Sequence, residues 1–214
     1  MQPRRMVSGT VFFLAIAAVA VGARSFAIGT TLEGQRSASA EIADIDGRPL
    51  NPFAPTGAAS VIFFIATDCP VSNSYSPEIQ RICTDYAPRG VTCSLIYEDV
   101  DLAPSASSLN ASVRRHLQEY RYSGISAAID RSRVIAKRAK ASVTPEAVVV
   151  DRSGKVQYRG RIDNFYAALG KTRREVTEHD LRDALDAVLS GKSVAKKERE
   201  ALGCFIVDPT ELRK

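Results

Sequence analysis

One cysteine stands where two differently patterned segments meet. The stretch "IATDCPVSNSYSPEI" covers residues 65–79 and contains Cys69. Before it, residues 58–66 are rich in β-forming side chains and too few to span a membrane. After it, a polar stretch punctuated by Pro70 and Pro77 is typical of a helix start. The pattern predicts a strand that delivers Cys69 to the N-terminus of a helix.

This placement favours the thiolate form of a cysteine. The free N–H groups and the partial positive charge of a helix N-terminus stabilise thiolate over thiol, and thiolate is the species that attacks disulfides and peroxides. Pro70 suits the first helical turn, where no backbone donor is needed. Ser72 occupies the place of the second cysteine in a CxxC motif; its hydroxyl can hydrogen-bond the thiolate but cannot form a disulfide. We expect Cys69 to be a redox nucleophile. The alternative is a structural half-cystine.

The N-terminus predicts export from the cytoplasm. Arg4 and Arg5 precede the uncharged, apolar stretch Met6–Ala23, which ends in small residues. This order indicates a secretory signal in residues 1–23, and the alternative is an uncleaved membrane anchor through residues 6–23. Either reading makes the protein periplasmic or otherwise exported. In that setting the four cysteines are candidates for disulfides, namely Cys69, Cys83, Cys93 and Cys204.

Composition and charge narrow the class of protein. The chain has 214 residues, 45% hydrophobic and 25% charged, as expected for a soluble globular domain. Its net charge of +5 is too small and too evenly spread to indicate a nucleic-acid partner. No GxSxG elbow occurs that would support a serine hydrolase, and no cofactor is indicated. Residues 24–40 are small and polar, which predicts a flexible linker.

The elements that must position Cys69 follow from periodicity and turn signals. We expect, in chain order, a hairpin in 41–53, a buried strand at 58–66, a helix at 74–86, a strand at 91–99, a loop at 101–110, helices at 111–120 and 134–141, a hairpin of strands 147–151 and 156–162, and a last helix that ends before Gly191. Thr177 and Asp180 predict a capping-box-like start for that last helix. This order describes an α/β sandwich with a mixed sheet.

A second unusual feature is a proline at the entrance of a predicted strand. Thr144-Pro145 directly precedes "EAVVVD". Proline is uncommon there unless the strand is at an edge or the turn is special. A cis peptide at this point would aim backbone groups toward a neighbouring loop.

Four motifs in this order resemble a known family. "FFIATDCPVSNSYSPEI", "VTPEAVVVDRSGKVQYRGRID", "TEHDLRDALDAVLSGKSV" and "LGCFI" are similar to the peroxiredoxin-like branch of the thioredoxin superfamily, the redoxin-domain proteins, over roughly residues 41–207. The resemblance implies a thioredoxin-like fold in residues 41–192, with a central mixed β-sheet flanked by helices and an N-terminal β-hairpin, followed by a tail, 193–214. It also implies that Cys69 is the nucleophile and that Pro145 is a cis-proline facing it.

The chain also departs from that family. Peroxiredoxins carry a threonine or serine three residues before the reactive cysteine; here that position is Ala66, with Thr67 displaced by one. They place an arginine beside the thiolate where this chain has Pro145-Glu146. Arginine and hydroxyl together polarise peroxide, so rapid peroxidase chemistry is not expected. Arg159 or Arg161 could substitute from the hairpin, the alternative being that both are surface charges.

The other cysteines have separate roles in this interpretation. The apolar tail "ALGCFIVD" recurs in the resembled family, which implies a role tied to the active site. A disulfide between Cys69 and Cys204 would make Cys204 the resolving thiol, and whether the two cysteines can meet is left open by the sequence. Cys83 lies late in a predicted helix and Cys93 in the strand that follows. A structural bridge between them is feasible, and the alternative is two buried free thiols.

The functional prediction is an exported thiol–disulfide oxidoreductase with a protein partner or electron donor that carries a thiol or disulfide. Cys69, Cys204, Ser72, Thr67 and Pro145 are its site residues. The alternatives are a weak thiol peroxidase and a non-catalytic binding or metal-delivery module. Copper-carrying relatives of this fold use two nearby cysteines and a histidine. Here the two histidines, His116 and His179, are expected on the surface, so no metal site is predicted.

Overall fold

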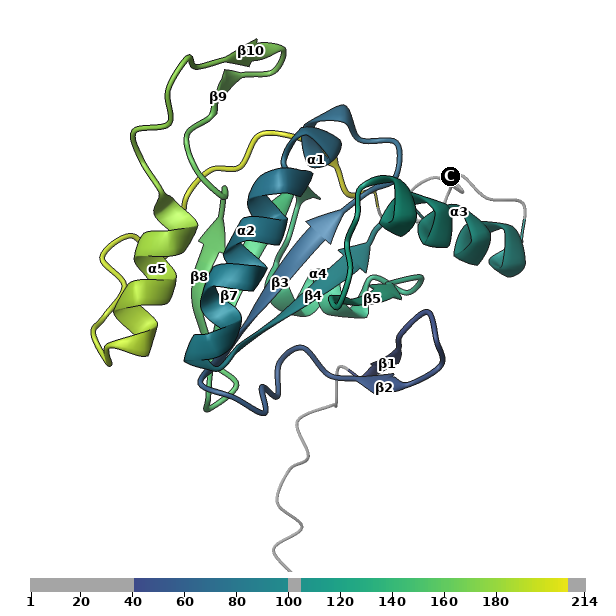
Figure 1. Ribbon diagram of the computed structural model, residues 1–214, viewed down its shortest axis with the longest axis horizontal. Coiled ribbons are helices and arrows are strands. Elements are labelled where there is room, and N and C mark those ends of the chain that lie inside the picture. The colour runs from purple at the N-terminus through teal and green to yellow at the C-terminus, as the bar shows by residue number, and fades with distance from the viewer. Residues whose placement is uncertain (1–40, 100–104, 208–214) are drawn as a thin grey trace, which may run out of the picture. The chain divides into compact units, whose positions relative to one another are not determined.

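A mixed five-stranded sheet forms the centre of the molecule. The computed structural model describes residues 41–99 and 105–207. The strand order is β5-β4-β3-β7-β8, in which β3 and β4 run parallel, as do β4 and β5, while β7 runs antiparallel to β3 and β8 (Figure 1). The bounds are β3 Ala59–Ile65, β4 Val91–Tyr97, β5 Ser126–Ile129, β7 Glu146–Asp151 and β8 Val156–Gly160.

The middle strand explains why the sheet is covered on both faces. All seven residues of β3 are buried, and all but Ser60 are apolar. This fits a central strand that has a parallel neighbour, β4, on one side and an antiparallel neighbour, β7, on the other. Its odd-numbered residues from Ala59 to Ile65 belong to one core cluster, and Ile62 and Phe64 belong to another. The alternation of side chains along a strand therefore divides the core into two layers.

Helices cover both layers. The first cluster includes apolar side chains of α2 (Ser76–Tyr86), α3 (Ala106–Glu119) and α5 (Asp180–Leu189). The second includes Ile135 and Ala136 of α4, Val134–Ala139. The predicted α/β class, with a central mixed sheet between helices, is confirmed.

Short strands complete the architecture. β1 (Ile42–Ala43) and β2 (Pro49–Leu50) form the predicted N-terminal hairpin. β9 (Tyr166–Ala168) and β10 (Lys171–Thr172) form a small hairpin that projects from the sheet (Figure 1). β11 (Cys204–Phe205) pairs antiparallel with β6 (Val143–Thr144). The last pair brings the C-terminal segment back onto the domain.

The helix expected at 74–86 is α2, and a separate short helix precedes it. α1 covers Pro70–Ser74 and α2 begins at Ser76, with Tyr75 between them. Pro77 causes the break between α1 and α2. It has no N–H to donate to the carbonyl of Asn73, and its ring would clash with a continuous helical turn at that point. Cys69 thus precedes a separate, short helix.

Two helix starts were wrongly predicted. α3 begins at Ala106, so part of the expected loop is helical, because Ser105 and Ser108 cap it reciprocally. α5 begins at Asp180, and its N-cap residue His179 makes no side-chain capping bond. Thr177 is not a cap, since its hydroxyl accepts a hydrogen bond from the Asn164 amide at 2.8 Å.

A disulfide joins α2 to β4. Cys83 and Cys93 are bridged, with their Cα atoms 5.9 Å apart and a sequence separation of 10. A single 3₁₀ turn, η1 (Ala87–Arg89), and Gly90 in the left-handed conformation (φ 79°) reverse the chain between the two cysteines. The bridge therefore ties α2 to β4 of the central sheet.

The predicted signal or anchor in residues 1–23 and the linker in 24–40 lie outside the described residues. Within the part that is described, none of the helices has the length and apolar character to span a bilayer.

Replacing both bridged cysteines, in Cys83→Ala/Cys93→Ala, should lower the free energy of unfolding by about 3 kcal/mol, because the cross-link restricts the unfolded chain. Urea unfolding of the purified variant measures the change. Cys204→Ala, which keeps the bridge, is the control and should lose much less. A double variant that unfolds at the wild-type urea concentration would contradict a stabilising bridge.

Candidate active site

Cys69 is the N-cap residue of α1. It follows the turn that leaves β3, its side chain accepts a hydrogen bond from the N–H of Ser72 at 3.5 Å, and Pro70 occupies the first helical turn. The cysteine is 1% exposed. α1 has only five residues, so its dipole is small. Individual contacts must therefore control the ionisation of the thiol.

The groups that contact the Cys69 thiol lie far from it in the sequence. The Thr144–Pro145 peptide bond is cis, and the Cys69 thiol donates to the carbonyl oxygen of Thr144 at 3.0 Å. β11 pairs with β6 in a register that sets Cys204 opposite Thr144. Cys204 donates to Cys69, with the two Sγ atoms 2.7 Å apart. The structure thus brings together Cys69, Cys204 and the residues flanking the cis bond.

The two thiols have opposite acidities. Burial raises the pKa of Cys69, but hydrogen bonds from Cys204, from the Ser72 N–H and from the side chains of Thr144 and Ser72 outweigh it, so the pKa lies below its usual value. For Cys204, burial, the hydrogen bond to Cys69 and the nearby charges of Cys69 and Asp68 raise the pKa to about 12. Cys69 is therefore the more acidic thiol of the pair, and Cys204 is the less acidic one, which donates to it.

Ser72 and Thr67 occupy different positions relative to the thiol. The Ser72 hydroxyl is buried, and it has no hydrogen-bond partner among the described residues. It is free to turn toward Cys69, whose pKa it lowers. The Thr67 hydroxyl and N–H both donate to Asp99 Oδ1 at 2.6 Å, so this side chain is engaged away from the thiol.

His116 was wrongly expected on the surface. It is 4% exposed. Its Nδ1 lies 2.8 Å from the hydroxyl of Tyr97, and its Nε2 lies 2.8 Å from Oδ1 of Asn73. The Asn73 amide in turn donates to the carbonyl of Thr67 at 3.0 Å. This chain of contacts fixes both ends of the segment that carries Cys69.

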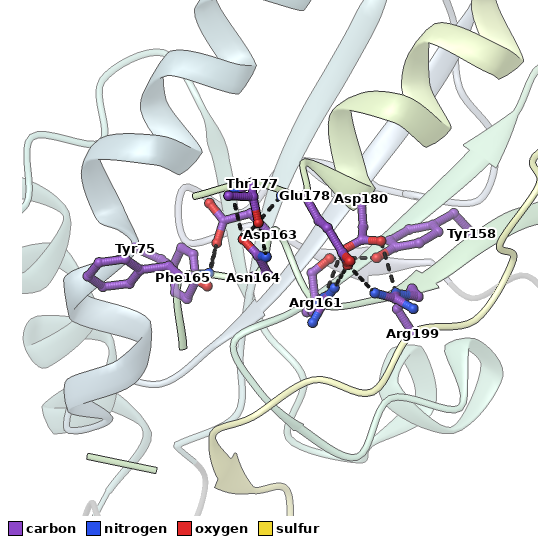
Figure 2. A network of polar contacts seen from close by, with 10 residues as sticks. All are labelled: Tyr75, Tyr158, Arg161, Asp163, Asn164, Phe165, Thr177, Glu178, Asp180 and Arg199. Atoms are coloured by element: carbon purple, nitrogen blue, oxygen red, sulfur yellow. Dashed lines mark hydrogen bonds and ion pairs between the residues drawn. The ribbon is translucent and has the colours of Figure 1, made fainter. Parts of the chain in front are cut away.

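Tyr75 holds the same segment from its other side. Its hydroxyl donates to Oδ1 of Asp163 at 2.7 Å, and the same oxygen accepts from the N–H of Phe165 at 2.8 Å (Figure 2). The Tyr75 ring lies edge-on to Phe165, with the centroids 6.1 Å apart. Since Tyr75 separates α1 from α2, these contacts fix the direction in which α1 presents Cys69.

Position 146, where peroxiredoxins place an arginine, is occupied here by a glutamate. Arg159 and Arg161, the two possible substitutes, are paired with carboxylates. Glu146 is buried, and its Oε2 accepts from the N–H groups of Ser142 and Val143 at 2.8 and 3.4 Å. Burial raises its pKa. Arg159 pairs with Glu198, and Arg161 pairs with Asp180 and Glu178. Glu146 instead orders the strand β6, on which the Cys204 segment pairs.

Comparisons with known proteins find similar solved structures but no similar family model or curated sequence. No protein-family model and no curated protein sequence matches the chain. An uncharacterised conserved protein from Geobacillus kaustophilus matches it with a TM-score of 0.65 and 28% identity, over 78% of this chain and 86% of the other. A hypothetical protein from Sinorhizobium meliloti gives a TM-score of 0.63 at 28% identity, over 78% and 91%.

A further solved structure is similar at lower sequence identity. A thioredoxin-like protein from Aeropyrum pernix matches with a TM-score of 0.51 and 17% identity, over 73% of this chain and 91% of the other. At that identity the likeness is one of fold.

Replacing the neighbouring thiol, in Cys204→Ala, should raise the pKa of Cys69, because burial continues to oppose ionisation while a hydrogen bond that favours it is lost. The pH dependence of thiolate absorbance measures the shift, since the other two cysteines are bridged. Ser72→Ala keeps the backbone donor and should give a smaller rise. An unchanged pKa in Cys204→Ala would contradict the assignment of Cys204 as a donor.

His116 should make folding sensitive to acid. Burial lowers its pKa from 6.5 to about 4, so between these values the unfolded chain binds the proton more strongly than the folded one. Stability present above pH 6.5 is therefore lost as the pH falls toward 4, by about 3 kcal/mol at most.

Urea unfolding between neutral pH and pH 4 measures this loss as the difference between wild type and His116→Gln. His179→Gln, at an exposed site, is the matched control and should follow the wild type. Parallel pH curves for wild type and His116→Gln would contradict the role of His116.

Proposed function

Since the chain has the fold of the thioredoxin-like proteins, we propose that it is an exported thiol–disulfide oxidoreductase of the peroxiredoxin-like type, with Cys69 as nucleophile and Cys204 as resolving thiol. The observation that carries the proposal is the thiol pair itself, with Sγ atoms 2.7 Å apart. The lowered pKa of Cys69 and the raised pKa of Cys204 give the two sulfurs different tasks.

In the first step the Cys69 thiolate attacks one sulfur of a partner's disulfide. A bond forms between Cys69 Sγ and that sulfur, the partner's S–S bond breaks, and the second partner sulfur leaves as a thiolate. Because Cys69 is 1% exposed, the segment carrying Cys204 must move aside for this attack. The hydrogen bond from the Ser72 N–H remains available to the thiolate during that movement.

In the second step Cys204 resolves the mixed disulfide. Its proton passes to the partner's thiolate, and its sulfur attacks Cys69 Sγ and displaces the remaining partner sulfur. Two electrons have then moved from the two cysteines to the partner, while the chain holds a Cys69–Cys204 disulfide. The partner leaves with one thiol and one thiolate, and the thiolate takes a proton from the solvent. The raised pKa of Cys204 keeps it protonated, and so less reactive, until its proton has an acceptor.

Regeneration should begin at Cys204. This residue is exposed whereas Cys69 is buried, so a thiolate of an external reductant meets the Cys204 sulfur first. Attack there expels Cys69, whose lowered pKa makes it the better leaving group. A second thiol then reduces the mixed disulfide on Cys204. The electron donor is thus a dithiol or two monothiols, and export would place it outside the cytoplasm.

Single-cysteine variants test the two roles. With oxidised glutathione as the disulfide, reduced wild type should form the Cys69–Cys204 disulfide, Cys204→Ser should accumulate glutathione on Cys69, and Cys69→Ser should react far more slowly. Mass mapping after acid quenching identifies each species, and the Cys83–Cys93 bridge serves as an internal control.

Cys69 that stays free under these conditions in wild type would contradict the proposal and favour a binding module. Replacing glutathione by stoichiometric peroxide tests the alternative substrate, because closure of the same bond would then indicate peroxidase activity.

A further inference from the structure

The segment of residues 197–207, here called the strap, carries Cys204 across the edge of the domain. Its backbone bonds to β8 through Arg159 N–H to Lys197 O at 2.8 Å and Arg199 N–H to Arg159 O at 3.0 Å. Beyond the two-residue ladder of β11 with β6, Ile206 N–H donates to Ser142 O at 2.9 Å. The strap is therefore attached on both sides of Cys204.

We propose that Arg199 and Gly203 are positioning residues of the thiol pair. They hold the strap at the distance from β6 and β8, and in the register with β6, that place Cys204 next to Cys69. The inference rests on the proposed function of that pair and adds the residues that control how easily it closes. Neither residue contacts the sulfur of Cys69 in the described structure, so each acts through the backbone of the strap.

Arg199 attaches the strap to the start of α5. Its Nε lies 2.9 Å from Asp180 Oδ1, and its guanidinium also pairs with Glu178. Arg161 pairs with the same two carboxylates, so two cations balance two anions at one place (Figure 2). Asp180 is 7% exposed, and a carboxylate so buried is costly without its partners. The cluster thus fixes the point at which the strap leaves β8.

Gly160 lets the strap lie close to the sheet at that point. Its φ of +148° is rarely adopted by residues with side chains, and a Cβ there would overlap the carbonyl of Arg199. The glycine of β8 and the arginine of the strap therefore form one close backbone contact.

Gly203 makes the same kind of contact directly before Cys204. A Cβ on residue 203 would overlap the carbonyl oxygen and carbon of Thr144 and lie 3.1 Å from the nitrogen of Pro145. That carbonyl oxygen is the one that accepts from the Cys69 thiol. Any side chain here must therefore lift the strap or shift the Thr144 carbonyl, and both movements separate the two sulfurs.

Lifting the strap should have two opposite effects. Closure of the Cys69–Cys204 disulfide becomes less favourable, because the effective concentration of one sulfur at the other falls. Attack by Cys69 on an external disulfide becomes faster, because the strap covers this buried thiol. A residue with a merely structural role would not move these two quantities in opposite directions.

The full-length protein, equilibrated with glutathione redox buffers and analysed by mass mapping, gives the effective concentration of Cys204 toward Cys69. Gly203→Ala should lower it by about tenfold or more, and Arg199→Ala by about threefold to tenfold, with partial recovery in Arg199→Lys. In a Cys204→Ser background, Gly203→Ala should speed the reaction of Cys69 with oxidised glutathione.

Two control variants match these changes. In Gly57→Ala, the Cβ would overlap the carbonyl of Gly90, a clash of the same kind on the loop that enters β3. Arg182→Ala removes an arginine of equal exposure, 25% against 26% for Arg199, that also pairs with two carboxylates, Glu78 and Asp85. Both controls should lose stability and keep the wild-type effective concentration.

The outcomes separate the two proposals. If wild type forms no Cys69–Cys204 disulfide in these buffers, the proposed function fails. If wild type closes and both Gly203→Ala and Arg199→Ala close equally well, the positioning role alone is overturned. Should Gly203→Ala fail to fold, the comparison of Arg199→Ala with Arg182→Ala decides the question.

Discussion

The site depends on a ladder of two residue pairs. β11 meets β6 with Cys204 opposite Thr144 and Phe205 opposite Val143. A slip of one residue would turn Cys204 to the other face of the ladder, so the closeness of the two sulfurs is set by backbone pairing. β6 is itself ordered by the buried carboxylate of Glu146. A buried carboxyl group thereby contributes to the site through hydrogen bonds from the backbone.

Local patterns in the sequence were sufficient for much of the framework. The largely apolar run of β3, the turn at Asp46-Gly47 and the hairpin of β7 and β8 each have a signal within a few residues. The position of Cys69 was predictable for the same reason, because a strand followed within a few residues by Cys-Pro is a short-range pattern. Its catalytic role and that of Cys204 remain proposals.

Features that depend on distant partners were missed. β5 reads only "SAAI", and it is a strand because β4 provides its hydrogen bonds. His116 follows two arginines on a polar helix, yet Tyr97 and Asn73 satisfy both of its ring nitrogens in the interior. The role of Arg199 could not be predicted from its basic stretch, because its partners Asp180 and Glu178 are distant in sequence. The early start of α3 was different, since the serine pair that caps it was visible in the sequence.

The separation of Cys69 and Cys204 along the chain gives their bond a thermodynamic weight. The two cysteines are 135 positions apart, so a disulfide between them would enclose nearly the whole domain in a covalent ring. Such a ring restricts the unfolded chain by about 4 to 5 kcal/mol in the chain-entropy account. Because oxidation and folding then form one closed cycle, the free energy by which the fold favours the disulfide equals the free energy by which the disulfide favours the fold. Each electron pair that leaves these sulfurs would therefore make the domain harder to unfold, and each pair that returns would loosen it by the same amount.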